Sequence, residues 1–232
     1  MKRTETRRRG TLLAVDPSLT VSGWAHFEIA SGALLSCGVV SPPPSKHPLH
    51  YRLKVLQAGV ETLMETLELD RRDVLVSEGP APLVKNPLSS LKVEQVRSIF
   101  EAVGRSRGLV VPGRINPRSV HTELLGLRGR QLGRAEVKSA ARTAAMQLYG
   151  RSFEHGCDES CGGCGHIPQD VIDALLVGSL ALSRLNFARG AQSKLYDVFD
   201  EKKRATRSSA GRSKAASRWS SEDVARAEKA GR

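Results

Sequence analysis

Two acidic residues directly follow short apolar runs, where a strand would present them at its end. Asp16 comes after Thr11–Val15, and Glu78 comes after Val74–Val76 and one serine. Both runs are typical of fully buried strands. Because the ligands of open α/β sheets bind at the carboxyl ends of strands, we expect both carboxylates at such an edge.

A second pair of acids, Asp170 and Asp173, is spaced so that both lie on one face of a helix. Asp173 lies inside the apolar stretch Ile172–Val177, where an unpaired carboxylate is costly. A divalent cation would neutralise such a cluster, and carboxylate oxygens suit Mg²⁺ or Mn²⁺. The four acids therefore predict a catalytic two-ion site about 4 Å wide, made by Asp16, Glu78, Asp170 and Asp173.

Each acid also has a structural explanation of its own. Asp16 would cap a turn, Glu78 would pair with Arg97, and Asp170 would be a favourable charge in the first turn of a helix. For any single residue we prefer this explanation. For all four together we prefer the metal site, because carboxylates on two strand ends and one helix could converge on it.

A cysteine-rich segment precedes the second acidic pair. Three cysteines and a histidine fall within ten residues, among several glycines, and His155 could replace the final histidine. Tetrahedral Zn²⁺ needs four such ligands on a bendable backbone. We hypothesise a structural zinc here, against the alternative of a reduced, metal-free loop; its ligands would be Cys157, Cys161, Cys164 and His166.

The positive charge of the chain is concentrated at its ends. The 232 residues include 36 Lys and Arg against 24 Asp and Glu, a formal net charge of +12. Residues 1–9 hold five basic residues and one acidic residue, and residues 201–232 hold ten and four. We interpret residues 1–9 as a disordered basic arm and 196–232 as a flexible basic tail, on a domain at 10–195 with its cysteine loop at 155–166. Contact with nucleic-acid phosphates is the function we prefer for both ends, and the alternative is that they serve solubility or are simply flexible.

The elements that must position these residues follow from hydrophobic period. Three strands with short turns predict an antiparallel meander, and two further strands alternate with helices. We therefore expect an α/β fold, a mixed five-stranded sheet with helices on both faces. The expected strands are 11–15, 24–29, 34–40, 74–76 and 109–111; the expected helices are 50–69, 91–103, 118–125, 134–149 and 169–187.

The order and wording of four segments resemble the RuvC-type Holliday-junction resolvases of the RNase H-like nuclease superfamily. The resemblance covers about residues 11–185. It rests on Leu12–Ser18 with Gly23, on Val76–Glu78, on Lys85-Asn86 with Ser90–Lys92 and Gln95–Arg97, and on Pro168–Asp170 with Asp173–Leu175.

This resemblance implies an RNase H-like fold and a homodimer that resolves four-way junctions by paired symmetric nicks. The four acids would hold two Mg²⁺ ions, and hydrolysis would leave 5′ phosphates. Gly79–Pro82 lacks the aromatic residue that some members use to unstack the junction. The resemblance also implies DNA contacts from Lys85, Lys92, Arg97, His121, Arg128, Arg130 and Arg134.

Three other classes fit parts of the sequence. A nuclease of the same superfamily that cuts flaps, other branched DNA or RNA:DNA hybrids is the main alternative. An actin-like or sugar-kinase ATPase would need a second half-domain with a glycine-rich phosphate loop. A non-enzymatic DNA-binding module would leave the four acids unexplained. We expect neither a membrane span nor a secretory signal, and a cytoplasmic location, nucleoid-associated in a bacterium or phage.

Overall fold

A computed structural model of the chain describes residues 10–80, 87–127, 133–154 and 167–200, with side chains of the third range described up to Gly150. The chain divides into two compact units at Phe199 and Asp200, and the fold belongs to the first unit. Its strands are β1 (Thr11–Asp16), β2 (Ser22–Glu28), β3 (Leu34–Val40), β4 (Val74–Glu78) and β5 (Arg114–Ile115).

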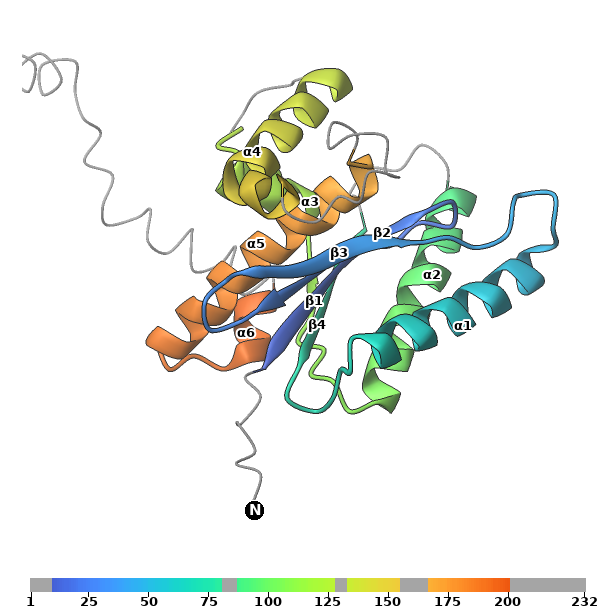
Figure 1. Ribbon diagram of the computed structural model, residues 1–232, viewed down its shortest axis with the longest axis horizontal. Coiled ribbons are helices and arrows are strands. Elements are labelled where there is room, and N and C mark those ends of the chain that lie inside the picture. The colour runs from blue at the N-terminus through green and yellow to red at the C-terminus, as the bar shows by residue number, and fades with distance from the viewer. Residues whose placement is uncertain (1–9, 81–86, 128–132, 155–166, 201–232) are drawn as a thin grey trace, which may run out of the picture. The chain divides into compact units, whose positions relative to one another are not determined.

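The helices alternate with the later strands (Figure 1). The four long helices form two groups, which pack on opposite faces of the sheet. They are α1 (Leu49–Thr66), α2 (Pro87–Ser106), α4 (Arg134–Glu154) and α5 (Gln169–Gly190); the short ones are α3 (Pro117–Ser119), the π-helical turn η1 (Val120–Leu124) and α6 (Leu195–Phe199).

One mixed sheet joins all five strands in the order β3-β2-β1-β4-β5. β1 pairs antiparallel with β2, and β2 with β3, which gives the expected meander. β1 pairs in parallel with β4, and β4 with β5. β1 therefore lies at the centre, and its carboxyl end points the same way as the carboxyl end of β4.

Side chains of β1 alternate between two apolar cores. Leu12 and Ala14 pack in a core with α5, whereas Leu13 and Val15 pack in a core with α1 and α2. Period-two alternation places neighbours on opposite faces, and both faces of this strand are covered by helices. This arrangement confirms the predicted α/β sheet with helices on both faces (Figure 1).

Helix α5 is apolar almost all round because it is buried against the sheet. By length and composition it could cross a membrane, but 72% of its most apolar stretch is buried inside the fold. A core helix has the same composition, since both environments exclude water.

The expected strand at 109–111 is wrong in extent. Within the described residues of this segment, Val110 forms a single bridge to Val74, and pairing with β4 resumes at Arg114–Ile115. The interruption has a local cause, because Pro112 has no N–H to donate and Gly113 has a φ of 155°. The expected helix at 118–125 is instead α3 followed by η1.

The globular part extends beyond the expected boundary at residue 195. Val198 and Phe199 of α6 are 4% and 3% exposed and belong to the core that contains α5. The short run Leu195–Phe199 was too brief to show a helical period.

Candidate active site

The carboxyl ends of β1 and β4 bring Asp16 and Glu78 together. Each is the last residue of its strand, and the parallel register pairs Val15 with Ser77, one position earlier on each strand. A hydrogen bond joins the two carboxyl side chains. The two acids that the sequence placed at strand ends are therefore direct neighbours.

Helix α5 delivers the other two acids to the same edge. Asp170 lies in its first turn and Asp173 one turn later, and both interact electrostatically with Asp16. The helix reaches this edge because Gly23, the β2 partner of Asp16, has no side chain. A Cβ on Gly23 would lie 1.9 Å from the carbonyl oxygen of Asp170.

Burial and mutual repulsion make this cluster unfavourable when all its members are ionised. Burial raises the pKa of Asp16 well above its usual value, and the charges of Glu78 and Asp173 add to the effect. Burial also raises the pKa of Glu78, to about 7. The pKa of Asp173 is raised, again mainly by burial, although a hydrogen bond from Gln169 (2.9 Å) opposes the change. Such a group of carboxylates gains most from a nearby positive charge.

Arg97, which was predicted as a DNA contact, is buried in this structure. Its side chain is 3% exposed and pairs with Glu94 on the preceding turn of α2. Its Nε donates to the backbone carbonyl of Glu78 at 2.6 Å. Arg97 therefore holds the strand end that carries Glu78 and does not reach the surface. The alternative expectation was that Arg97 pairs with the Glu78 carboxylate. The hydrogen bond runs instead to the main chain of Glu78, although the charge of Arg97 partly opposes the rise in the pKa of that carboxyl.

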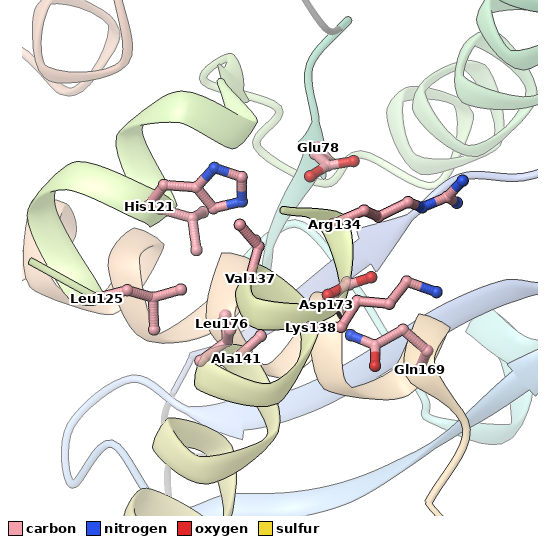
Figure 2. Close-up of a pocket in the computed structure, with 11 residues that line it drawn as sticks. Glu78, His121, Leu125, Arg134, Val137, Lys138, Ala141, Gln169, Asp173 and Leu176 are labelled. Atoms are coloured by element: carbon pink, nitrogen blue, oxygen red, sulfur yellow. Dashed lines mark hydrogen bonds between the residues drawn. The ribbon is translucent and has the colours of Figure 1, made fainter. Parts of the chain in front are cut away.

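A cavity of about 340 Å³ adjoins the acids (Figure 2). Glu78 and Asp173 line it together with the cationic or titratable side chains of His121, Arg134 and Lys138. The rest of its wall is mainly apolar, with side chains from η1, α4 and α5. The cavity thus combines acids that suit a cation with basic groups that suit a phosphate.

Lys138 did not stand out in the sequence as a site residue. It follows Arg134 by four residues, and Arg142 follows it by four more, so one face of α4 carries all three. This spacing was the available signal. Arg142 is used differently, since its Nη2 donates to the carbonyl of Ile167 at 2.9 Å, just before α5 begins.

The remaining candidates divide into one described residue and several that are not. Lys92 is exposed on α2, as a DNA contact requires. The predicted contacts and zinc ligands that lie outside the described residues are Lys85, Arg128, Arg130, Cys157, Cys161, Cys164 and His166, with the alternative ligand His155.

The donor chemistry of the acidic cluster fits a divalent cation. It offers carboxylate oxygens, the ligands that Mg²⁺ and Mn²⁺ prefer, and their repulsion would be relieved by such a charge. Within residues 10–80, 87–127, 133–150 and 167–200, no three Asp, Glu, His or Cys side chains are already grouped closely enough to hold a metal ion. A metal role for the four acids accordingly stays a prediction.

The chain shares its fold with solved structures of RuvC. The structural likeness is to RuvC of Thermus thermophilus: 17% identity and a TM-score of 0.55 to one structure, covering 79% of this chain and 98% of that one. For RuvC in complex with a Holliday junction substrate the values are 18% and 0.54, covering 80% and 99%.

A third similar structure is the yeast mitochondrial Holliday junction resolvase Ydc2, at 12% identity and a TM-score of 0.47, covering 80% of this chain and 87% of that one. No protein-family model matches the sequence, and no curated protein matches it either. The two Thermus structures carry the fold assignment, which confirms the predicted RuvC-like architecture.

Proposed function

We propose that this protein is a divalent-metal-dependent endonuclease that resolves four-way DNA junctions. The observation that carries the proposal is the meeting of Asp16, Glu78, Asp170 and Asp173 at one sheet edge. The shared fold with RuvC, which has been captured on a Holliday junction substrate, supports the choice of substrate.

Asp16, Glu78, Asp170 and Asp173 would hold two Mg²⁺ ions, which supply an activated water and stabilise the leaving oxygen in phosphodiester hydrolysis. Gln169 orients Asp173 through its hydrogen bond. Lys138, Arg134 and His121 face the same cavity and bind the phosphate backbone of the strand to be cut. Cleavage on the 3′-oxygen side leaves a 5′ phosphate.

The assembly and setting follow from the substrate. A four-way junction has two equivalent strands to cut, and a two-fold homodimer presents two sites in the matching symmetry. The basic ends of the chain hold flanking phosphates, and the segment 157–166 binds a structural zinc. The protein works where DNA is, in the cytoplasm or at the nucleoid of a bacterial or phage-infected cell.

The test uses labelled four-way, flap, duplex and RNA:DNA hybrid substrates, each with Mg²⁺ or with EDTA. We expect paired nicks in the four-way junction that require Mg²⁺ and fall by more than about 100-fold in Asp16→Asn, beyond the usual cost of losing a residue that only orients a metal ligand. Asp73→Asn is the matched control. Asp73 is also buried but lies before β4, where Thr11 bonds its carboxylate.

Two outcomes would contradict the proposal in different ways. Cleavage that persists in EDTA or in Asp16→Asn would overturn the metal site. Efficient cutting of flaps or hybrids with an intact four-way junction would retain the chemistry and replace the substrate.

A further inference from the structure

The end of β4 is held by two hydrogen bonds on either side of the Glu78–Gly79 peptide. Arg97 donates to the carbonyl oxygen of Glu78 at 2.6 Å, and the N–H of Gly79 donates to the carbonyl oxygen of Ile115 at 2.7 Å. The peptide that follows the Glu78 side chain therefore has little freedom to tilt. The Glu78 side chain therefore starts from a restrained backbone position.

Arg97 is itself fixed by a chain of ion pairs within the fold. Its guanidinium pairs with Glu94, and Glu94 also pairs with Arg114 at 2.8 Å. Arg114 continues the chain to Glu101 through bonds of 2.7 and 3.1 Å. Glu101, only 7% exposed at its side chain, accepts a hydrogen bond from the hydroxyl of Ser77 at 3.1 Å.

The chain of ion pairs thus begins and ends on consecutive residues of β4. It meets Ser77 at the side chain and Glu78 at the main chain, and it ties both to α2 and β5. We call Arg97, Glu94, Arg114 and Glu101 the β4 clamp. Arg97 and Glu101 are buried, whereas Glu94 and Arg114 are 39% and 32% exposed at their side chains. Ion pairs of this kind contribute little net stability, so a role in fixing geometry is the one to test.

Exposure separates this role from a DNA contact. The side chain of Arg97 is 3% exposed, whereas Lys92 on the same helix is exposed. A side chain with 3% exposure offers almost no surface to a phosphate. Its effect must therefore pass through Glu78.

We propose that Arg97 is a positioning residue, which with the rest of the β4 clamp holds the Glu78 carboxylate beside Asp16 in the placement that divalent-cation binding requires. This inference rests on the proposed metal site. Its test therefore includes direct metal binding, which needs no DNA substrate.

The experiment compares Arg97→Met and Arg97→Lys with the wild-type protein. Mn²⁺ binding is measured by electron paramagnetic resonance, and four-way-junction affinity by fluorescence anisotropy in EDTA. We expect Arg97→Met to weaken Mn²⁺ binding by about 10–100-fold, as the loss of a residue that orients a metal ligand does elsewhere. Junction affinity should stay at the wild-type value. Arg97→Lys keeps a hydrogen-bond donor but loses the planar guanidinium. Its Mn²⁺ affinity should therefore lie between those of the wild-type protein and Arg97→Met.

Two control variants separate position from general stability and from DNA contact. Asp73→Asn removes a buried charge at the other end of β4 and should lower the melting temperature while leaving Mn²⁺ affinity unchanged. Lys92→Gln should weaken junction affinity and leave Mn²⁺ affinity unchanged.

Wild-type Mn²⁺ affinity in both Arg97 variants would overturn the proposal, as would a loss of junction affinity without a loss of Mn²⁺ affinity. Should Arg97→Met fail to fold, Arg97→Lys decides between the same outcomes. A wild-type protein that binds Mn²⁺ but cuts no branched DNA would overturn the proposed function alone. A wild-type protein that binds no Mn²⁺ would overturn the metal site and this inference with it.

Discussion

The carboxyl groups of Asp16 and Glu78 share a hydrogen bond in a buried setting, so at least one of them holds a proton at moderately acid pH. The proposed metal ion would have to displace that proton. At the residue scale, a proton and the proposed cation would therefore compete for the same oxygens. The nearby basic side chains only partly offset the repulsion, since Lys138 and His121 act on Asp173 more weakly than burial does.

This competition predicts how stability depends on pH. The pKa of Glu78 is raised from 4.5 to about 7 in the fold, so the folded state holds a proton that the unfolded state releases. The stabilisation is complete below about pH 4.5 and is lost as the pH rises from there through about 7, a loss on the order of 3 kcal/mol. In EDTA, wild-type protein should lose more stability between about pH 5 and about pH 8 than Glu78→Gln, as measured by urea unfolding.

Two checks accompany this prediction. Glu65→Gln, an exposed substitution on α1, should keep the wild-type pH profile. Added Mg²⁺ should stabilise wild-type protein more at high pH than at low pH. Parallel pH profiles for wild type and Glu78→Gln would refute the assignment of the titrating group.

At the element scale, two glycines allow α5 to lie against the sheet. A Cβ on Gly23 would overlap the main chain of Asp170, and a Cβ on Gly178 would lie 2.2 Å from the ring of Phe27. The first contact is at the acidic edge, whereas the second is in the apolar core. A side chain at position 23 would therefore disturb the acidic edge, whereas one at position 178 would disturb only the packing of the core.

We expect Gly23→Ala and Gly178→Ala to destabilise the protein by roughly 1–3 kcal/mol each, as overpacking commonly does. Only Gly23→Ala should also weaken metal binding, by about 10-fold or more, because it displaces the helix turn that carries Asp170. Thermal unfolding with and without Mg²⁺ measures both effects. An equal loss of the Mg²⁺-induced shift in both variants would show that α5 moves as one rigid body.

The strands show which sequence patterns were sufficient to predict secondary structure. The strands Thr11–Asp16 and Leu34–Val40 were predicted almost to the residue, because apolar runs bounded by turn residues are local signals. The pairing at 109–115 was not, because Pro112 and Gly113 divert the chain between Val110 and Arg114. Whether the chain then rejoins β4 depends on neighbours far away in the sequence.

At the scale of the whole molecule, positive charge is concentrated at the two ends of the chain. Residues 1–9 and 201–232 hold 15 of the 36 basic residues. The fold itself ends with Val198 and Phe199 in the core. A truncation after Asp200 should therefore retain the fold, whereas one after residue 195 should expose the core and lower the melting temperature.

A variant lacking 1–9 and 201–232 should bind a four-way junction with a shallower dependence on salt. Each phosphate that the ends no longer neutralise reduces the slope of log K against log salt by about 0.9. The cleavage rate at saturating protein should stay at the wild-type value, because the acids lie in the domain. An unchanged slope, measured by anisotropy from about 50 to about 200 mM salt, would show that the ends do not touch DNA.

The sequence alone determined the four acids, the two strand ends and the helix that carry them, because residue type and hydrophobic period are local properties. Tertiary structure decided how they meet: the parallel register of β1 and β4 makes Asp16 and Glu78 neighbours, and Gly23 admits α5 to the same edge. It also buried Arg97 against the main chain of Glu78, and it brought Lys138 into the cavity. Burial and the direction of a side chain arise from contacts between distant segments, and those contacts separate a positioning arginine from a phosphate-binding one.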